Sequence, residues 1–347
     1  MNRWRLILLP FSILYGTITG IRNLLYKVGI FSSYEIPVPS IIVGNLSVGG
    51  TGKTPHVAYL TSFLKDKYNI AILSRGYGRK TKGFLVVTTD SIAADVGDEP
   101  LEYKSKFGSD VQVFVCEKRK TGIEMILKQF PDTDLILLDD AFQHRAVRAG
   151  LSILISDYSR PFFRDFVLPA GNLREWKDGE KRADLCIFSK CPPELSEQNK
   201  THYRSTFHNP QQVFFSSVVY GSLIPLSGHS IPSDISDIIL VTGIANPKPI
   251  REYLSSEAKV TPVVFPDHHR FSLQDIHRIH EIFRNFTHGK AIIVTTVKDA
   301  MRLLTEEFKN ETNEFPWFML PIEVDIEDSG RFTNEIIQYV ESHKRSS

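Results

Sequence analysis

The chain has 347 residues, enough for two domains and a large buried core without disulfide bonds or structural metal. With 42% hydrophobic and 23% charged residues, the composition excludes a disordered, collagen-like or coiled-coil protein. The formal net charge is +1, so no nucleic acid partner is expected. The three cysteines form no CxxC pair, which predicts buried core residues rather than a disulfide framework or a zinc site.

The first 32 residues are apolar and carry only scattered basic residues. The uncharged run at residues 6–21 contains a proline and two glycines and is shorter than the about 20 residues that a spanning helix needs. Other interpretations are a cleaved signal peptide, for which no A-x-A-like site follows, and a helix buried against the body. We expect residues 1–32 to form a membrane-associated helical segment in the lipid interface.

Beyond this segment, short apolar runs alternate with stretches of helical spacing, which is typical of a parallel α/β sheet. The expected strands lie at residues 40–43, 70–73, 84–88, 111–116, 135–139, 151–156, 185–188, 238–242, 260–265 and 291–296. The expected helices lie at residues 55–65, 120–129, 273–286 and 299–308. A polar stretch at residues 192–212 indicates a boundary or connection. We expect an α/β protein with a P-loop NTPase-like, mostly parallel sheet domain at 33–220 and a smaller C-terminal α/β domain at 221–347.

A glycine-rich loop follows the first expected strand and precedes a helix, the context that a Walker A phosphate loop requires. Its eight residues are Ser47, Val48, Gly49, Gly50, Thr51, Gly52, Lys53 and Thr54. The backbone N–H groups of such a loop bind phosphates, and the helix N-terminus adds to the attraction. We expect Lys53 to contact the β- and γ-phosphates and Thr54 to bind Mg²⁺. Ser47 stands where the simple pattern has glycine, and the Gly49–Gly50 pair supplies the conformational freedom instead.

Two aspartates end the apolar strand at residues 135–139. Asp139 is in the position of a Walker B carboxylate, which binds Mg²⁺ directly or through water. Asp140 begins the next loop and is close enough to act as a second carboxylate beside the phosphates. The alternative is a pair of exposed carboxylates at a strand end.

No clear guanine-recognition motif is present, because Lys298 and Asp299 are adjacent rather than spaced as in N-K-x-D. ATP is therefore the expected nucleotide. A small-molecule kinase would need an acceptor site and a base near the γ-phosphate. A switch or metal-insertion NTPase with a protein partner, and a membrane-bound scaffold with a vestigial nucleotide site, are the alternatives from other classes.

Seven motifs occur in a fixed order after the apolar N-terminus. They are VGNLSVGGTGKTP at residues 43–55, LSRGYGR at 73–79, VGDEP at 96–100, LDDAFQH at 138–144, GNLRE at 171–175, PDHH at 266–269 and VKDA at 297–300. Together they resemble the tetraacyldisaccharide 4′-kinase (lipid A 4′-kinase) family, from the N-terminus to about residue 305. Ala141 stands where this family usually has glycine, and Asn172 where it often has proline. Both departures affect loop shape rather than chemistry.

The resemblance implies transfer of the γ-phosphate of ATP, with Mg²⁺, to the 4′-hydroxyl of an acylated disaccharide 1-phosphate, giving lipid IVA. It assigns Asp98 as the base, with His268 from the other domain as its partner, and Lys53 and Asp140 at the phosphates. His269 is the alternative to His268. Without the resemblance, the favoured interpretation of Asp98 is a loop carboxylate that caps a helix at Pro100.

The expected acceptor-binding residues are Arg75, Tyr77, Arg79, Gln143, Arg174 and Glu175. Arginines at a strand end suit an anion such as the 1-phosphate, although a solvated basic loop is the alternative for the first three. Arg174 and Glu175 could instead hold the aspartate cluster, and structural hydrogen bonding is the alternative for Gln143. A tetraacylated acceptor stays in the bilayer, so the resemblance implies a peripheral or monotopic enzyme on the cytoplasmic face of the bacterial inner membrane. The expected partners are this lipid and the membrane surface, without an obligate protein partner.

Overall fold

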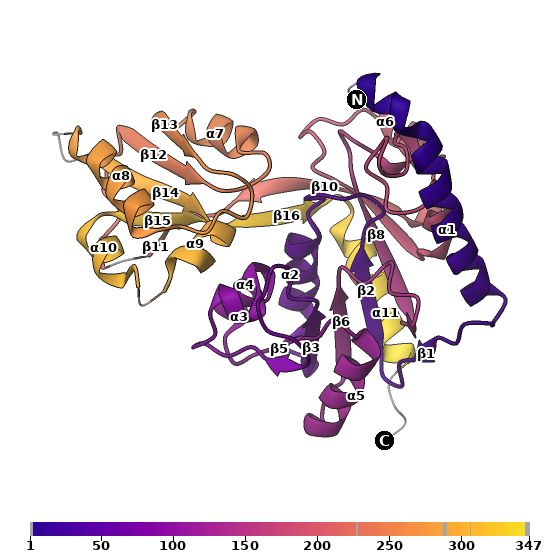
Figure 1. Ribbon diagram of the computed structural model, residues 1–347. Helices are drawn as coiled ribbons and strands as arrows, with labels where there is room; N and C mark the ends of the chain where they lie inside the picture. Colours follow the sequence, from indigo (N-terminus) through magenta and orange to yellow (C-terminus); the bar gives the residue numbers. More distant parts are fainter. Residues whose placement is uncertain (1–2, 227, 287–289, 306, 344–347) are drawn as a thin grey trace.

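The computed structural model describes residues 3–226, 228–286, 290–305 and 307–343 and contains two large sheets flanked by helices (Figure 1). The first and last residues of the expected domain ranges, 1–2 and 344–347, lie outside the described residues. Within the described residues, the larger sheet has nine strands and the second sheet has five. The mixed α/β architecture with a mostly parallel sheet agrees with the sequence prediction.

The larger sheet is parallel except at its two edges. Its strands, in spatial order, are β16 (Ile322–Ile326), β10 (Val213–Tyr220), β9 (Leu185–Ser189), β8 (Leu151–Asp157), β2 (Ser40–Gly44), β6 (Leu135–Asp139), β3 (Ile70–Ser74), β5 (Gln112–Val115) and β4 (Leu85–Val86). The central strands are buried along their whole length, which explains their unbroken apolar sequences. The carboxyl ends of β2, β3 and β6 therefore meet at one edge, where the phosphate loop begins.

Helices and short 3₁₀ turns cover this sheet. The helices are α2 (Lys53–Leu64), α3 (Ala93–Val96), α4 (Asp98–Phe107), α5 (Arg119–Gln129), α6 (Glu197–Arg204) and α11 (Ser329–Ser342), with turns η2 (Phe162–Arg164), η3 (Lys177–Arg182) and η4 (Pro210–Gln212). Two apolar clusters lie on the two faces of the sheet, since alternate residues of each strand point to opposite sides. The three cysteines are buried and free, as the sequence predicts.

The second sheet has the order β11 (Ile224–Pro225), β15 (Trp317–Leu320), β14 (Ala291–Thr296), β12 (Asp237–Thr242) and β13 (Lys259–Val264). Its helices are α7 (Lys248–Leu254), α8 (Leu273–Arg284), α9 (Val297–Leu303) and α10 (Lys309–Glu314). The helix expected at 299–308 is observed as α9, which starts earlier and is shorter. It starts earlier because Thr296 caps it by accepting a hydrogen bond from the Asp299 N–H.

A ribbon formed by β10 and β16 connects the two sheets (Figure 1). β10 pairs with β9 at its start and with β16 over Ser216–Tyr220. β16 and α11 follow the second sheet in sequence but return to the larger one, where Phe332, Ile336 and Val340 join its core. The last part of the expected range 221–347 thus belongs to the larger sheet. The chain pattern did not reveal this return, because β16 alternates buried and exposed residues and has no long apolar run.

The polar stretch 192–212 is a connection inside the larger sheet rather than a boundary between sheets. It contains α6 and leads from β9 to β10. Helix α6 has a cap, since the Ser196 hydroxyl accepts a hydrogen bond from the Asn199 N–H. The change of sheet comes after it, along β10.

The N-terminus is one continuous helical segment that lies on the surface of the larger unit (Figure 1). It consists of η1 (Arg3–Leu8) and α1 (Leu9–Lys27). The chain then forms a small parallel pair, β1 (Tyr34–Glu35) with β7 (Val147–Arg148). Only 11% of the apolar stretch in this segment is buried. The segment is therefore not a helix buried against the body of the protein, which was one of the alternatives. By length and composition, it is the one helix among the described residues that is able to cross a membrane.

Candidate active site

The phosphate loop joins β2 to α2, as the sequence predicts. Gly52 precedes α2 with φ 89°, a left-handed conformation that favours glycine. Val48 N–H donates to the Asn172 carbonyl at 2.8 Å, and Ser47 forms a bridge with Leu173. The segment at 171–175 therefore supports the start of the loop, and Ser47 has a structural place there.

Three polar side chains hold the rest of this loop. The Asn45 amide donates to the Thr51 hydroxyl at 2.8 Å, and the Ser189 hydroxyl donates to the Thr51 carbonyl at 2.7 Å. His56 makes contacts through both ring nitrogens, to the Gly52 carbonyl at 2.7 Å and to the Ser216 hydroxyl at 2.9 Å. Burial lowers the pKa of His56 to about 4, so its ring is neutral near pH 7. The loop is thus shaped before any phosphate is bound.

Asp139 is fully buried at the end of β6. Neither of its carboxylate oxygens has a hydrogen-bond partner among the described residues. Burial raises the pKa of Asp139 to about 8, and the Glu99 carboxylate adds to this effect. An unpartnered buried carboxylate beside a phosphate loop has the chemistry of a site for a divalent cation.

Asp140 connects the phosphate loop to the segment at 171–175. Its backbone has a positive φ of 47°. The Arg174 guanidinium donates to both of its oxygens, at 2.9 and 3.1 Å, and Lys53 Nζ lies 3.6 Å from Oδ1. Burial acts to raise the pKa of Asp140, but Lys53 and Arg174 outweigh it, and the net pKa is lowered. Asp140 therefore remains ionised and orients the lysine of the phosphate loop.

Gln143 and Glu175 extend this network toward the N-terminal helix. The Gln143 amide donates to the Asn45 carbonyl at 2.7 Å and to Glu175 at 3.1 Å. Glu175 is buried and also accepts hydrogen bonds from Asn23 of α1 and from Arg182. These two expected acceptor-binding residues have structural partners here, and their contact with an acceptor stays a prediction.

The motif at residues 96–100 places Asp98 at the start of α4 rather than in a free loop. Gly97 has φ 94°, and a Cβ there would lie 3.1 Å from the backbone of Gly76. Only glycine allows this approach of two backbones. Burial raises the pKa of Asp139, and the Glu99 carboxylate at the start of α4 adds to this rise.

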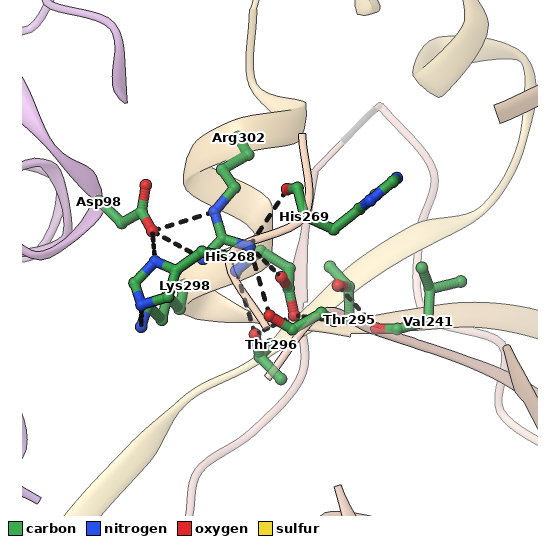
Figure 2. A network of polar contacts seen from close by, with 10 residues as sticks. Asp98, Val241, His268, His269, Thr295, Thr296, Lys298 and Arg302 are labelled. Carbon is green, nitrogen blue, oxygen red and sulfur yellow. Dashed lines mark hydrogen bonds and ion pairs between the residues drawn. The ribbon is translucent and has the colours of Figure 1, made fainter. Parts of the chain in front are cut away.

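Asp98 meets residues of the second sheet (Figure 2). His268 Nδ1 lies 3.3 Å from Asp98 Oδ2, so the expected pair is assembled across the two units. Burial acts to raise the pKa of Asp98, but hydrogen bonds from His268 and Arg302 outweigh it and lower the pKa. His269 instead contacts Asp275 at 3.1 Å, which favours His268 as the partner.

The loop after β3 carries residues of two kinds: Arg75 and Tyr77 have exposed side chains, whereas Arg79 contacts other parts of the protein. The Tyr77 ring lies 5.4 Å from the His268 ring. Burial lowers the pKa of His144, and the cations Arg119 and Arg75 add to this effect. Arg79 donates to the Gly83 carbonyl and forms an ion pair with Glu117 at 2.9 Å. Its guanidinium is thus engaged by the scaffold, and its expected contact with an acceptor stays a prediction.

Several charged residues that lie around the phosphate loop and Asp139, or around the Asp98–His268 pair, were not identified from the sequence. Arg119 is buried at the start of α5 and donates to the Asp139 carbonyl at 2.9 Å. Lys190 donates to the Gly50 carbonyl and contacts Asp157 at 3.0 Å. Lys298 and Arg302 of α9 surround the Asp98–His268 pair. Lys298 belongs to a motif that the sequence singled out, whereas nothing local distinguishes the other three from surface basic residues.

The N-terminal helix is tied to the same segment. Arg5 donates to the carbonyls of Pro169 and Gly171, and α1 packs Gly16 against the indole of Trp176. Large apolar side chains remain exposed along the outer face of η1 and α1, among them Ile7, Phe11, Leu14, Ile18 and Ile21. A surface of this kind suits a lipid interface.

The parallel sheet, the glycine loop that leads into α2 and the aspartate pair at the end of β6 define a nucleotide-binding protein of the P-loop class. A family model described as tetraacyldisaccharide-1-P 4′-kinase matches residues 4–341.

Named relatives agree with this match. The tetraacyldisaccharide 4′-kinase of Bacteroides thetaiotaomicron is 42% identical, over 100% of this chain and 95% of that protein. The protein of the same name from Flavobacterium psychrophilum is 43% identical, over 99% of this chain and 98% of that protein. A crystal structure of LpxK from Aquifex aeolicus in complex with ATP has a TM-score of 0.76 and 32% identity, covering 97% of this chain and 99% of that chain. The chain belongs to the tetraacyldisaccharide 4′-kinase family.

Proposed function

We propose that this protein transfers the γ-phosphate of ATP to the 4′-hydroxyl of tetraacyldisaccharide 1-phosphate, which gives lipid IVA. The observation that carries the proposal is the placement of α4. Its first residue, Asp98, forms the pair with His268, and its second residue, Glu99, acts electrostatically on Asp139. The candidate base thus lies on α4 directly before a carboxylate that acts on the candidate metal ligand, Asp139. Family membership does not favour the alternative of a partner-driven switch or metal-insertion NTPase.

The phosphate loop supports ATP binding, and the relative from Aquifex aeolicus was solved in complex with ATP. Lys53 is fixed by Asp140, whose other contact is Arg174. A positioned ammonium stabilises the negative charge on the transferring phosphoryl group, so Lys53 needs little reorganisation during transfer.

Asp139, whose carboxylate has no hydrogen-bond partner among the described residues, and Thr54 at the start of α2 would hold Mg²⁺. When bound, the ion would neutralise phosphate charge and hold the β- and γ-phosphates in place. Arg119 supports this position by donating to the Asp139 carbonyl. These contacts leave the Asp139 carboxylate free for a ligand.

The attack on phosphorus needs the acceptor hydroxyl to lose its proton. Asp98 is the base in this proposal, since it is largely buried, ionised and held by His268. A positioned base contributes about 10²–10⁴-fold to such a reaction. Tyr77, beside the His268 ring, is placed to contact the sugar.

The apolar outer face of α1 supports an interfacial location, with the protein on the cytoplasmic side where ATP is available. Helix α1 contacts the segment at 169–176, which also carries Arg174 and Glu175. The lipid acceptor and the phosphate loop are therefore brought to one face of the protein.

The test compares phosphate transfer from ATP to the lipid with ATP hydrolysis in its absence, using Mg²⁺ and detergent. We expect transfer by the wild type, its loss in Lys53→Ala, and a reduction of about 10²-fold or more in Asp98→Asn with nucleotide binding retained. Hydrolysis of ATP without label in the lipid would reject the kinase. Full transfer by Asp98→Asn would reject this base.

A further inference from the structure

The two oxygens of Asp98 have different surroundings. Oδ2 accepts hydrogen bonds from Arg302 Nη2 at 2.6 Å, Arg302 Nε at 3.0 Å and His268 Nδ1 at 3.3 Å. Figure 2 shows these three contacts converging on a single oxygen. Oδ1 accepts no hydrogen bond from the described part of the chain. One oxygen is thus fixed by Arg302 of α9 and by His268 of the loop after β13, and the other is left to react.

A second set of contacts, made through Nη1, holds the Arg302 guanidinium in place. Its Nη1 donates to the buried Asp299 carboxylate at 2.8 Å and lies 3.4 Å from the carbonyls of Gly243 and His269. Asp299 also accepts hydrogen bonds from the Thr296 hydroxyl at 2.7 Å and the Gly243 N–H at 3.0 Å. The side chain of Arg302 is only 7% exposed. Its planar fork therefore presents Nε and Nη2 to Asp98 in one fixed orientation.

Lys298, one turn earlier on α9, contacts the other ring nitrogen of His268. Its Nζ lies 3.1 Å from His268 Nε2. An ammonium only donates, so Nε2 is the acceptor and the ring proton is on Nδ1. This tautomer directs the Nδ1–H toward Asp98, which makes His268 a donor to the carboxylate rather than the group that takes its proton.

We propose that Arg302, with Lys298 beside it, is the positioning residue that selects Asp98 Oδ1 as the proton-accepting atom of the phosphoryl transfer. The inference rests on the proposed function. The acceptor hydroxyl donates its proton to Oδ1, the O–H bond breaks, and the hydroxyl oxygen forms the new bond to phosphorus while ADP leaves. Arg302 does not touch the substrate; it orients the carboxylate and keeps it ionised.

The charged groups facing Asp98 determine how this arrangement depends on pH. On its own helix, Glu99 is its neighbour and Glu102 lies one turn away; from the second unit come His268, Lys298 and Arg302. Burial and Glu99 raise the pKa of Glu102 to about 7, so this residue titrates in the assay range as well. Loss of Arg302 removes a cation beside Asp98, raises its pKa and moves the acidic limb of the pH–rate profile to higher pH. Measuring the pH–rate profiles in a Glu102→Gln background removes the titration of Glu102, so that the remaining acidic limb reports on Asp98.

The test measures kcat and kcat/KM for the lipid against pH in Arg302→Gln, Arg302→Lys and the control Arg278→Gln, an exposed arginine on α8. We expect Arg302→Gln to lower kcat about 10²-fold and to move the acidic limb upward, with KM for ATP unchanged. Arg302→Lys keeps a cation against Asp299 and should retain the limb near the wild-type position, but with reduced kcat because the two-pronged contact is lost. The control should match the wild type.

A folded Arg302→Gln protein whose acidic limb does not move would overturn the inference and leave Arg302 a structural residue. If Arg302→Gln does not fold, wild-type kcat in Arg302→Lys would overturn it instead. If the wild type phosphorylates the lipid, both of these outcomes overturn only the role of Arg302, and the proposed kinase activity is retained. A wild type without lipid phosphorylation rejects the proposed function, and the inference with it.

Discussion

Replacement of Arg174 by methionine tests whether the network around Asp140 serves the nucleotide or the acceptor. In the structure, Arg174 donates to both oxygens of Asp140, while Lys53 lies 3.6 Å away. Without the guanidinium, Asp140 has Lys53 as its main cationic partner. The lysine is then drawn toward the carboxylate and away from the phosphates, so we expect weaker ATP binding.

The size of this effect follows from the geometry. A hydrogen bond to a charged group contributes about 1.5–3 kcal/mol, and both side chains are about one quarter to one third exposed, at 27% and 30%. We therefore take the lower end, about 1.5 kcal/mol for the pair, which corresponds to a roughly tenfold increase in KM for ATP. The assay is steady-state transfer at varied ATP with saturating lipid, then at varied lipid with saturating ATP.

Arg174→Lys is the matched control because it keeps the charge, and it should show a smaller increase. An unchanged KM for ATP together with a raised KM for the lipid would refute this reasoning. That result would return Arg174 to the acceptor-binding role that the sequence resemblance implied.

Three further predictions concern the scaffold. Gly16→Leu places a Cβ 2.5 Å from the indole of Trp176, so we expect α1 to separate from the body of the protein. Phosphate transfer to the lipid should fall while binding to lipid vesicles is retained, and loss of both would contradict this prediction. Ile336→Ala in the core under α11 should lower the free energy of unfolding by about 2–5 kcal/mol in urea titrations, whereas a change near zero would mean that α11 is not docked. His56 has a folded pKa of about 4 against 6.5 unfolded, so its contribution of up to about 3 kcal/mol is present above pH 6.5 and lost as the pH falls toward 4. His56→Gln should flatten the stability profile in that window, and an unchanged slope would show that His56 does not carry it.

The larger sheet and the phosphate loop were predictable because their signals are local. Each central strand is an unbroken apolar run, and the glycine loop ends in Gly52-Lys53-Thr54 directly before a helix. Such patterns depend on burial and on backbone conformation within a few residues. All ten expected strands overlap observed ones, with ends that differ by at most two residues.

The return of the chain to the larger sheet was not predictable in this way. β16 pairs with β10 across about one hundred residues, and no local pattern records this pairing. The 192–212 stretch is polar because it is an exposed connection, and polarity alone does not distinguish a loop within a sheet from a boundary between sheets.

The charged residues around the candidate base show the same limit. Asp98 and His268 were identified through the motif resemblance, and the structure brings them together. Arg302 reaches Asp98 over 204 positions in the sequence, so only the folded arrangement of the two units reveals the contact. Arg79 lies in a motif that suggested anion binding, and its contact with Glu117, 38 positions further along the chain, is likewise visible only in the folded structure.

The most direct measurement of the central claim is the fate of the γ-phosphate. ATP labelled at this position is incubated with the protein, Mg²⁺ and tetraacyldisaccharide 1-phosphate in detergent, and the lipid is extracted and its phosphorylated position determined. The account predicts label on the 4′-oxygen with the wild type and none with Lys53→Ala. Label that appears only as free phosphate, or on another position of the lipid, would contradict it.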